Sequence, residues 1–116
     1  MTARTVLVIV GALAVPLVPA TVAGAGATRT VTIGDDYYSP TKMTVKAGTT
    51  VRWRWPDDTG DSHDVKLRSG PSGVRRFQSE EAGSAYTFRR TLRVRGTYRI
   101  VCTLHDEMRQ TITVTR

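Results

Sequence analysis

Apolar and charged residues alternate over several short stretches of this chain, and the alternation limits the folds open to it. In the run 51–55, Val-Arg-Trp-Arg-Trp, every second residue is apolar, and residues 88–95 place Phe88, Leu92 and Val94 in one parity and arginines in the other, with Arg90 as an exception. A period of two is that of a β-strand with one buried face. No segment shows sustained helical periodicity, and glycines recur at short intervals, as turns would require. We therefore predict an all-β Greek-key sandwich of seven or eight strands.

The first 27 residues differ in character from the rest. Arg4 gives a positive start, residues 5–18 are apolar and uncharged, and the small residues 23–27 offer cleavage sites. These features are typical of a secretory signal peptide, and the apolar stretch is shorter than the roughly 20 residues that span a bilayer. An uncleaved membrane anchor is the alternative. We predict a signal peptide at residues 1–27 and one domain at residues 28–116. We expect the domain to be exported to the periplasm, the cell envelope or the exterior, without stable membrane insertion.

Cys102 lies at the end of a predicted strand and is followed by His105 and Met108 at intervals of three residues. Tyr98, Ile100 and Cys102 share one parity, so we expect the thiol to point inward. Thiolate and thioether are soft ligands and imidazole also suits copper. The chain has one cysteine and two histidines, and the second histidine is His63. One site made of His63, Cys102 and His105, with Met108 as a weak axial ligand, would use them all. That is the ligand set of blue-copper electron-transfer sites.

Simpler interpretations exist for each of these residues. A single cysteine is commonly a small buried hydrophobe, and methionine commonly fills a core. Zinc is the nearest competing metal, but structural zinc sites favour several thiolates or Cys/His pairs and seldom use a thioether. An exported chain with one free thiol favours ligation, because such a thiol is a liability unless it is buried or bound to a metal.

Several segments around these residues resemble the cupredoxins, in particular the small plastocyanin/amicyanin-like type. The similar segments are residues 31–33, 38–40, 43–53, 62–65, 96–102 and 108–114. The resemblance implies a single type 1 copper ion held by His63, Cys102, His105 and Met108. It also implies that His105 is the more exposed ligand and the electron exit, beside an apolar surface. Leu104 is a candidate for that surface.

Three positions depart from the usual pattern of the cupredoxins. Asp64 follows the first histidine where asparagine is common, and this position usually ties the two ligand loops together. Gln110 stands where glycine is common, so the turn into the last strand is expected to differ. No proline flanks His105. None of these departures removes a predicted ligand.

Charge is distributed unevenly along the chain. The sequence has 17 Lys and Arg and 10 Asp and Glu; loss of Arg4 with the leader leaves 16 basic residues, a net charge of +6. Six carboxylates lie near the predicted ligands in sequence, so we expect an acidic metal end and a basic barrel: Asp57, Asp58, Asp61, Asp64, Asp106 and Glu107. The arginines alternate along strands and do not cluster with aromatic residues, which argues against nucleic acid as a partner.

These observations favour an electron carrier over an enzyme. After His63 and His105 are assigned to one site, no histidine remains for a second metal or for an open substrate site. We predict a monomer that exchanges electrons with a redox partner protein, and the acidic metal end suggests a basic docking patch on that partner. Two other functions remain open. One is an extracytoplasmic copper carrier or chaperone with the same ligands, and the other is a sandwich that binds partners without metal.

Overall fold

The computed structural model describes residues 2–3, 11 and 26–116 of the 116-residue chain. Most of the predicted signal peptide lies outside the described residues, so that assignment and the boundary at residue 28 stay predictions. The described residues contain no helix long and apolar enough to cross a membrane.

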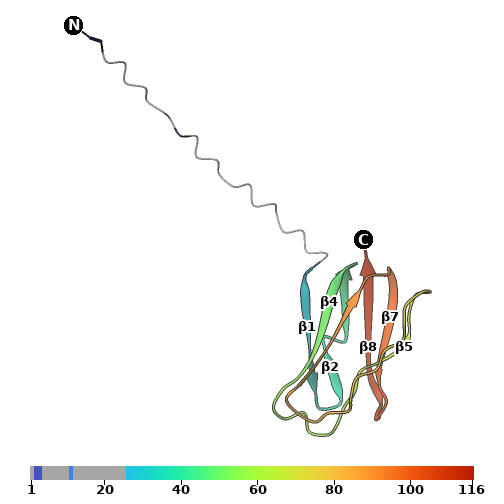
Figure 1. Cartoon of the computed structure of the whole chain (residues 1–116). Coiled ribbons are helices and arrows are strands. Elements are labelled where there is room, and N and C mark those ends of the chain that lie inside the picture. Colours follow the sequence, from blue (N-terminus) through green and yellow to red (C-terminus); the bar gives the residue numbers. More distant parts are fainter. Residues whose placement is uncertain (1, 4–10, 12–25) are drawn as a thin grey trace.

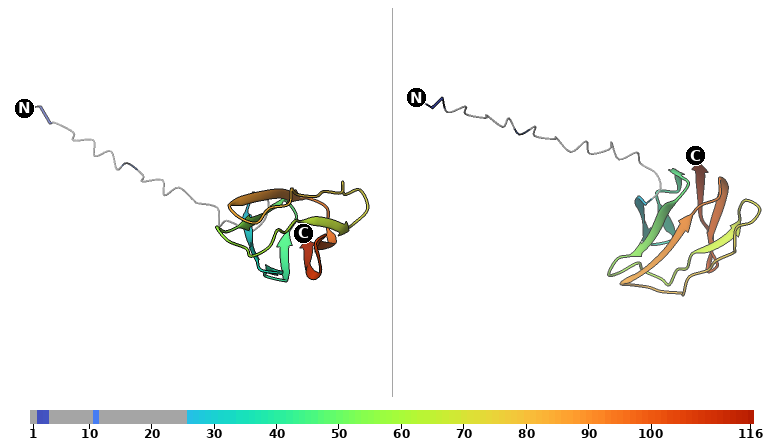
Figure 2. Two further views of the ribbon diagram at one scale, coloured as in Figure 1. Left: turned by 90° about the horizontal axis from the view of Figure 1, so that it is seen from below. Right: turned by 45° about the horizontal axis from the view of Figure 1, so that its top comes forward.

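Eight strands form two four-stranded sheets that pack into a sandwich (Figures 1 and 2). One sheet has the order β2-β1-β4-β6, with β1 at Thr28–Gly34, β2 at Tyr37–Ser39, β4 at Thr49–Trp55 and β6 at Tyr86–Leu92. The other has the order β3-β8-β7-β5, with β3 at Lys42–Lys46, β8 at His105–Thr115, β7 at Gly96–Cys102 and β5 at Lys66–Ser69. The predicted all-β sandwich of seven or eight strands is confirmed.

Strand direction gathers the longest irregular segments at one end of the sandwich. β1 runs parallel to β4, β3 runs parallel to β8, and the other neighbours are antiparallel. As a result β1, β4 and β7 finish at the same end, which is the lower end in Figure 1, and β6 and β8 begin there. We call this end, made of residues 35–36, 56–65, 79–85 and 103–108, the loop end.

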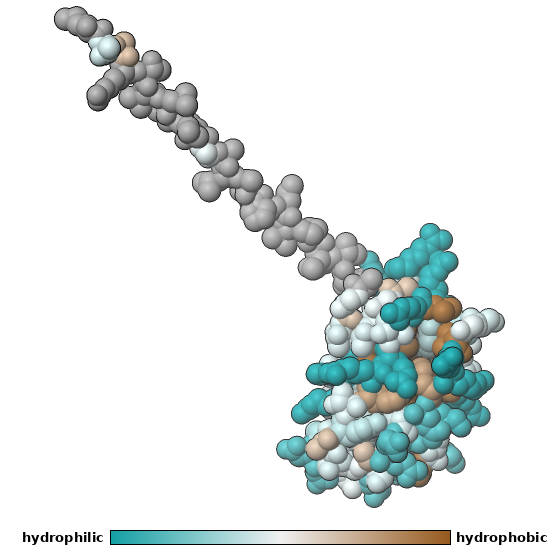
Figure 3. Space-filling model, in the orientation of Figure 1, coloured by the Kyte–Doolittle hydropathy of each residue, from teal (hydrophilic) through white to brown (hydrophobic). Residues whose placement is uncertain are grey.

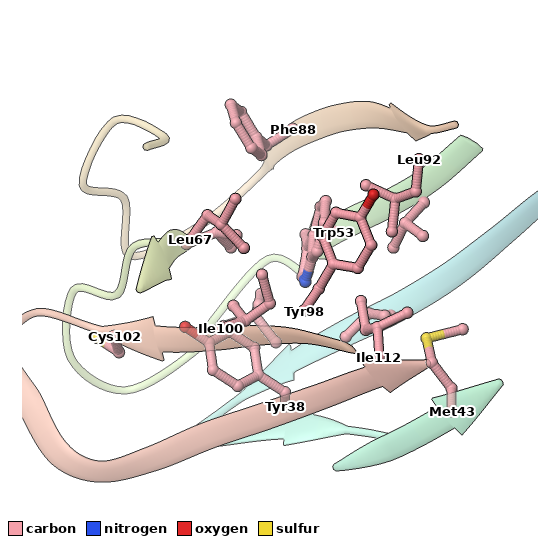
Figure 4. Packing of buried hydrophobic residues seen from close by; sticks show 14 of the residues in the cluster. Tyr38, Met43, Trp53, Leu67, Phe88, Leu92, Tyr98, Ile100, Cys102 and Ile112 are labelled. Atoms are coloured by element: carbon pink, nitrogen blue, oxygen red, sulfur yellow. The ribbon is translucent and has the colours of Figure 1, made fainter. Parts of the chain in front are cut away.

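The core lies between the sheets and is built from the apolar face of each strand (Figure 4). Val51, Trp53 and Trp55 are at most 1% exposed, while Arg54 between them faces solvent, as the alternation predicts. Tyr98, Ile100 and Cys102 are likewise buried, which confirms that the thiol points inward. These are the positions at which a pleated strand turns every second side chain to one face.

Residues 88–95 follow the alternation only in part. Phe88 and Leu92 are buried as expected, but Val94 lies beyond the end of β6 and is 38% exposed, so its predicted inward orientation is wrong. The exception at Arg90 has a physical cause. β6 is an edge strand, and the Arg90 guanidinium lies 4.3 Å from the centroid of the Phe88 ring, a cation–π contact at the sheet surface.

Gln110 is a buried polar residue that joins the two sheets. Its Oε1 accepts a hydrogen bond from Trp53 Nε1 at 2.9 Å, and its Nε2 donates to the Pro40 carbonyl at 2.7 Å. Both ends of the amide are therefore satisfied, as a buried amide requires. Glutamine, at a position where glycine is common in the cupredoxins, therefore links the two sheets across the core.

Candidate metal centre

His63 lies in the irregular segment between β4 and β5, held by backbone hydrogen bonds on both sides. Its N–H donates to the Ala82 carbonyl at 2.9 Å, and Ala82 N–H donates to the His63 carbonyl at 3.0 Å. The same carbonyl also accepts from Trp55 Nε1 at 3.3 Å. His63 therefore lies in a loop that this bridge holds against Ala82. The imidazole is fully buried, so its position is fixed by the fold.

The β7–β8 hairpin supplies the other predicted ligands. Cys102 ends β7 and pairs with His105 at the start of β8, across the turn Thr103–Leu104. The next pair back along the hairpin is Val101 with Arg109, so residues 106–108 form a bulge on β8 with no counterpart on β7. A bulge bends its strand and redirects side chains.

The structure brings three of the four predicted ligands together. His63 Nδ1 lies 3.2 Å from His105 Nδ1, and Cys102 Sγ lies 3.6 Å from the same His105 atom. The donor atoms of all three residues lie within 4.8 Å of one another. Met108 is buried in the bulge and belongs to the apolar core. Its role as the axial ligand stays a prediction.

The outer nitrogens of both imidazoles face acceptors. His63 Nε2 lies 3.0 Å from the Thr59 carbonyl oxygen, which can only accept, so this nitrogen carries the hydrogen. His105 Nε2 lies 3.1 Å from Asp36 Oδ1 and 3.7 Å from Asp61 Oδ2, and these carboxylates favour a hydrogen on that nitrogen too. In the neutral tautomers the two Nδ1 lone pairs then face each other and repel. A proton or a metal ion between them relieves this repulsion.

The donor set therefore fits a thiophilic cation. Two imidazole lone pairs and one sulfur converge on a single point, and this combination selects copper or zinc over magnesium or calcium. Hydrogen bonds from the outer nitrogens to fixed acceptors are the usual way in which proteins orient histidine ligands. Burial raises the pKa of the Cys102 thiol, and the nearby Asp64 charge contributes in the same direction. Cys102 is also buried, which limits the access of solvent to its thiol.

Asp64 connects the two ligand segments. Its carboxylate accepts from Thr103 N–H at 2.7 Å, from the Thr103 hydroxyl at 2.5 Å and from Gln78 Nε2 at 3.1 Å. Its backbone carbonyl accepts from the Tyr38 hydroxyl at 2.7 Å. An aspartate thus ties the loops at the position where asparagine is common. Asp64 is fully buried, so it lies beside the ligands at the metal end but adds no exposed carboxylate to that end.

Sequence reasoning missed the turn between β1 and β2. Asp36 in this turn has a φ of 64° and reaches His105, and its buried Oδ1 has no hydrogen-bond partner besides this contact among residues 26–116. The alternating run ending at Gly34, followed by two aspartates, was the available signal for a turn. Only the parallel pairing of β1 with β4 shows that the turn lies beside the ligands.

Solved structures with this fold include copper proteins. The reduced copper(I) form at pH 4 of a proline-to-glycine variant of amicyanin is 28% identical, with a TM-score of 0.65, covering 78% of this chain and 83% of that chain. An oxidized proline-to-alanine variant of amicyanin is 26% identical, with a TM-score of 0.66, covering 78% and 85%.

A copper-containing nitrite reductase from Thermus scotoductus SA-01 is 23% identical, with a TM-score of 0.63 over 75% of this chain. This chain spans 22% of the reductase, and at this identity the likeness concerns the fold alone. A search among curated protein sequences gives no significant match.

The fold and the converging donors define a cupredoxin-type β-sandwich with a possible copper site made of His63, Cys102 and His105. The family described as cupredoxin-like domain matches residues 6–114, and the chain belongs to that family. The amicyanin variant is described as a copper(I) form, and the same fold here brings His63, Cys102 and His105 together as candidate copper ligands.

Proposed function

We propose that this protein is a type 1 copper electron-transfer protein that passes single electrons between redox partners. The observation that carries the proposal is the convergence of His63 Nδ1, His105 Nδ1 and Cys102 Sγ at the end of a cupredoxin sandwich. In this proposal Met108 is the axial ligand. Copper at such a site supplies one-electron chemistry, by cycling between copper(I) and copper(II).

The protein contributes a preorganised ligand geometry. His63 is held by its backbone bridge to Ala82 and by the contact of Nε2 with Thr59, and Asp64 fixes the hairpin turn against the His63 segment. A site that cannot rearrange exchanges electrons with little reorganisation. We therefore propose a carrier and not an enzyme, because the sequence holds no further histidine for a second centre.

We infer that electrons leave near His105. Its side chain is 18% exposed while His63 is buried, and Leu104 beside it is 44% exposed. Carboxylates surround this exit: Asp36 and Asp61 contact His105, and Asp57, Asp58, Asp106 and Glu107 are exposed at the same end. This supports a monomeric carrier whose redox partner has a basic docking patch.

Small oxidants test the direction of the field at this exit. A cationic oxidant should react faster than an anionic one at low salt, and its advantage should shrink as the salt concentration rises. A faster anionic reagent would mean that the basic body dominates at the exit, and the basic docking patch would then be rejected.

We further propose that residues 1–27 direct export and that residues 28–116 act in the periplasm, the cell envelope or the exterior. The charged start, the apolar stretch and the small residues before Thr28 support this assignment. Amino-terminal sequencing of protein recovered from the envelope fraction of an expressing cell would locate the cleavage site.

A visible spectrum after addition of copper(II) tests the function most directly. The purified protein should bind one equivalent and turn blue, because the Cys102 thiolate transfers charge to copper. Cys102→Ser should abolish the colour, since a hydroxyl is a harder and far weaker donor, whereas the neighbouring Thr103→Ser should keep it. Blue colour in Cys102→Ser would falsify the assignment. Copper that binds but passes rapidly to a chelator, without reversible redox cycling, would favour the copper carrier.

A further inference from the structure

All ten carboxylate residues of the chain lie at the loop end or directly beside it. They occupy residues 35–36, 57–64, 80–81 and 106–107. The 16 lysines and arginines of residues 26–116 are spread over the strands and the opposite end, and none of them forms an ion pair with a carboxylate within this range. The domain is therefore an electrostatic dipole, acidic at the loop end and basic at the other.

The basic end is formed by a defined set of strand ends and turns. β1 begins there, β3 and β8 end there, and the β6–β7 turn lies there, as the pairs Lys46–Thr115, Thr49–Leu92 and Gly96–Val114 require. These segments carry a set of exposed cations that we call the basic pole: Arg29, Lys46, Arg75, Arg93, Arg95 and Arg116. Arg75 joins the set because it lines the same cavity as Arg93; Arg76 and Arg90 also line this cavity, but the guanidinium group of each donates to a backbone carbonyl.

Apolar side chains lie between these cations. A cavity of about 400 Å³ opens between the loop that carries Arg75 and the end of β6, and Val74, Phe77 and Val94 form part of its apolar lining. Val94 is 38% exposed. On the face shown in Figure 3, brown apolar side chains lie among teal hydrophilic ones over the upper part of the domain.

We propose that the basic pole binds the surface of an anionic phospholipid bilayer. The guanidinium group is complementary to phosphate, because its planar donors fit the phosphate oxygens and its charge is opposite. Clustered cations are also attracted to anionic headgroups by the negative surface potential of the membrane. Exposed apolar groups between the cations suit the boundary between headgroups and acyl chains. A single-stranded nucleic acid would instead need exposed aromatic platforms, which this end lacks among the described residues.

The start of the domain supports this occupant. β1 begins at Thr28 at this end, so the uncharged apolar stretch at residues 5–18 joins the domain beside the basic pole. If this stretch is held in a bilayer, the domain begins only about ten residues after it, so the basic pole is the end of the domain nearest in sequence to the headgroups. The loop end then faces away from the membrane toward soluble partners.

Vesicle sedimentation tests the inference on the purified full chain. Vesicles of phosphatidylcholine alone measure any binding by the apolar N-terminal stretch, and vesicles with added phosphatidylglycerol measure the charge-dependent part. We expect binding to the anionic vesicles to exceed binding to the zwitterionic ones and to fall as salt rises. Arg75→Glu with Arg93→Glu should weaken the charge-dependent binding about 30-fold or more.

The control has the same net charge but changes cations near the loop end, Arg54→Glu with Lys66→Glu; both residues are exposed. It should retain most of the binding. An equal loss in both double variants would overturn the proposal, because only total charge would then matter. Equal binding of the unmodified protein to both vesicle types, at every salt concentration, would also overturn it and needs no variant.

Discussion

The two ends of the sandwich are closed in different ways. At the loop end, long irregular segments are cross-linked by side chains, as when Asp64 binds Thr103 and Ser79 Oγ accepts from Val65 N–H at 2.8 Å. At the other end two of the connections are short turns, residues 47–48 and 93–95, and backbone hydrogen bonds donated by Ala47 and Gly48 close the first of them. There, one buried hydroxyl, that of Tyr98, donates to the Val94 carbonyl at 2.6 Å. Side-chain cross-links are concentrated where loops must hold a site still.

Asp64→Ala should break the cross-linked end most severely. It leaves the Thr103 N–H and Gln78 without their charged acceptor, so we expect the free energy of unfolding of the copper-free protein to fall by about 2–4 kcal/mol. Denaturant titration measures this loss. Asp57→Ala, an exposed acid of the same segment, should change stability by less than about 0.5 kcal/mol. Equal effects of the two substitutions would show that the Asp64 cross-link is unimportant.

Met108→Leu sharpens the comparison within the loop end, between the histidines held by hydrogen bonds and Met108, the proposed axial ligand, which is buried in the core. We expect copper to stay bound, because an axial thioether tunes the metal more than it holds it. Loss of a donor that favours copper(II) should raise the reduction potential by about 60 mV, a tenfold change for one electron. Voltammetry measures the potential. Complete loss of copper would mean that Met108 is more than an axial ligand.

Tyr98→Phe and Tyr38→Phe compare the hydroxyls that close each end. Each should cost about 1 kcal/mol for one hydrogen bond. We expect only Tyr38→Phe to shift the copper spectrum, since Tyr38 binds the carbonyl of Asp64. A spectral shift in Tyr98→Phe would contradict the separation of the two ends.

The same two tyrosines should also affect how the stability of the protein changes with pH in alkaline solution. Burial raises the pKa of Tyr98 and of Tyr38, so the folded protein keeps both hydroxyls protonated at pH values where the unfolded chain ionises. Their contribution to stability is complete below the ordinary tyrosine pKa of about 10 and is lost as pH rises above it. Either substitution should therefore reduce the alkaline decline in stability.

Asp36→Asn should have the smallest effect of these substitutions, a small change in the reduction potential. The carboxylate beside His105 Nε2 stabilises the more positive copper(II) state, and it is partly exposed, so its contribution is about 0.2–1 kcal/mol. The reduction potential should rise by roughly 10–40 mV. Asp106→Asn removes a charge at the same end without contact to His105 and should change the potential less. If the two variants behave alike, the Asp36 contact has no specific role.

Much of the fold was predictable because burial imposes a period of two on each strand. Val51, Trp53 and Trp55 show it clearly, and the same parity placed Cys102 in the interior. The prediction for Val94 was wrong because Val94 lies beyond the end of β6, where side chains no longer alternate between the two faces of a sheet. Arg90 departs from the alternation because β6 is an edge strand, at which the Arg90 guanidinium can lie over the Phe88 ring.

The candidate site was predictable where residue type limited the choice. With one cysteine and two histidines, the meeting of His63, Cys102 and His105 followed from composition and spacing. The surroundings depend on topology, which local sequence does not encode. Asp36 reaches His105 only through the pairing of β1 with β4, and burial of Asp64 depends on Thr103, 39 residues away.

The separation of His63 from the hairpin in sequence also determines when the centre can form. The loop between His63 and Cys102 contains β5 and β6, so both strands must find their places before the three donors meet. Contacts of this long range form late, because the entropy of closing the loop must be overcome first. In the unfolded chain Cys102 and His105 stay close in sequence but His63 is distant, so the complete three-donor site is absent. Metal binding therefore selects the fully folded state and adds its binding free energy to the stability of the fold.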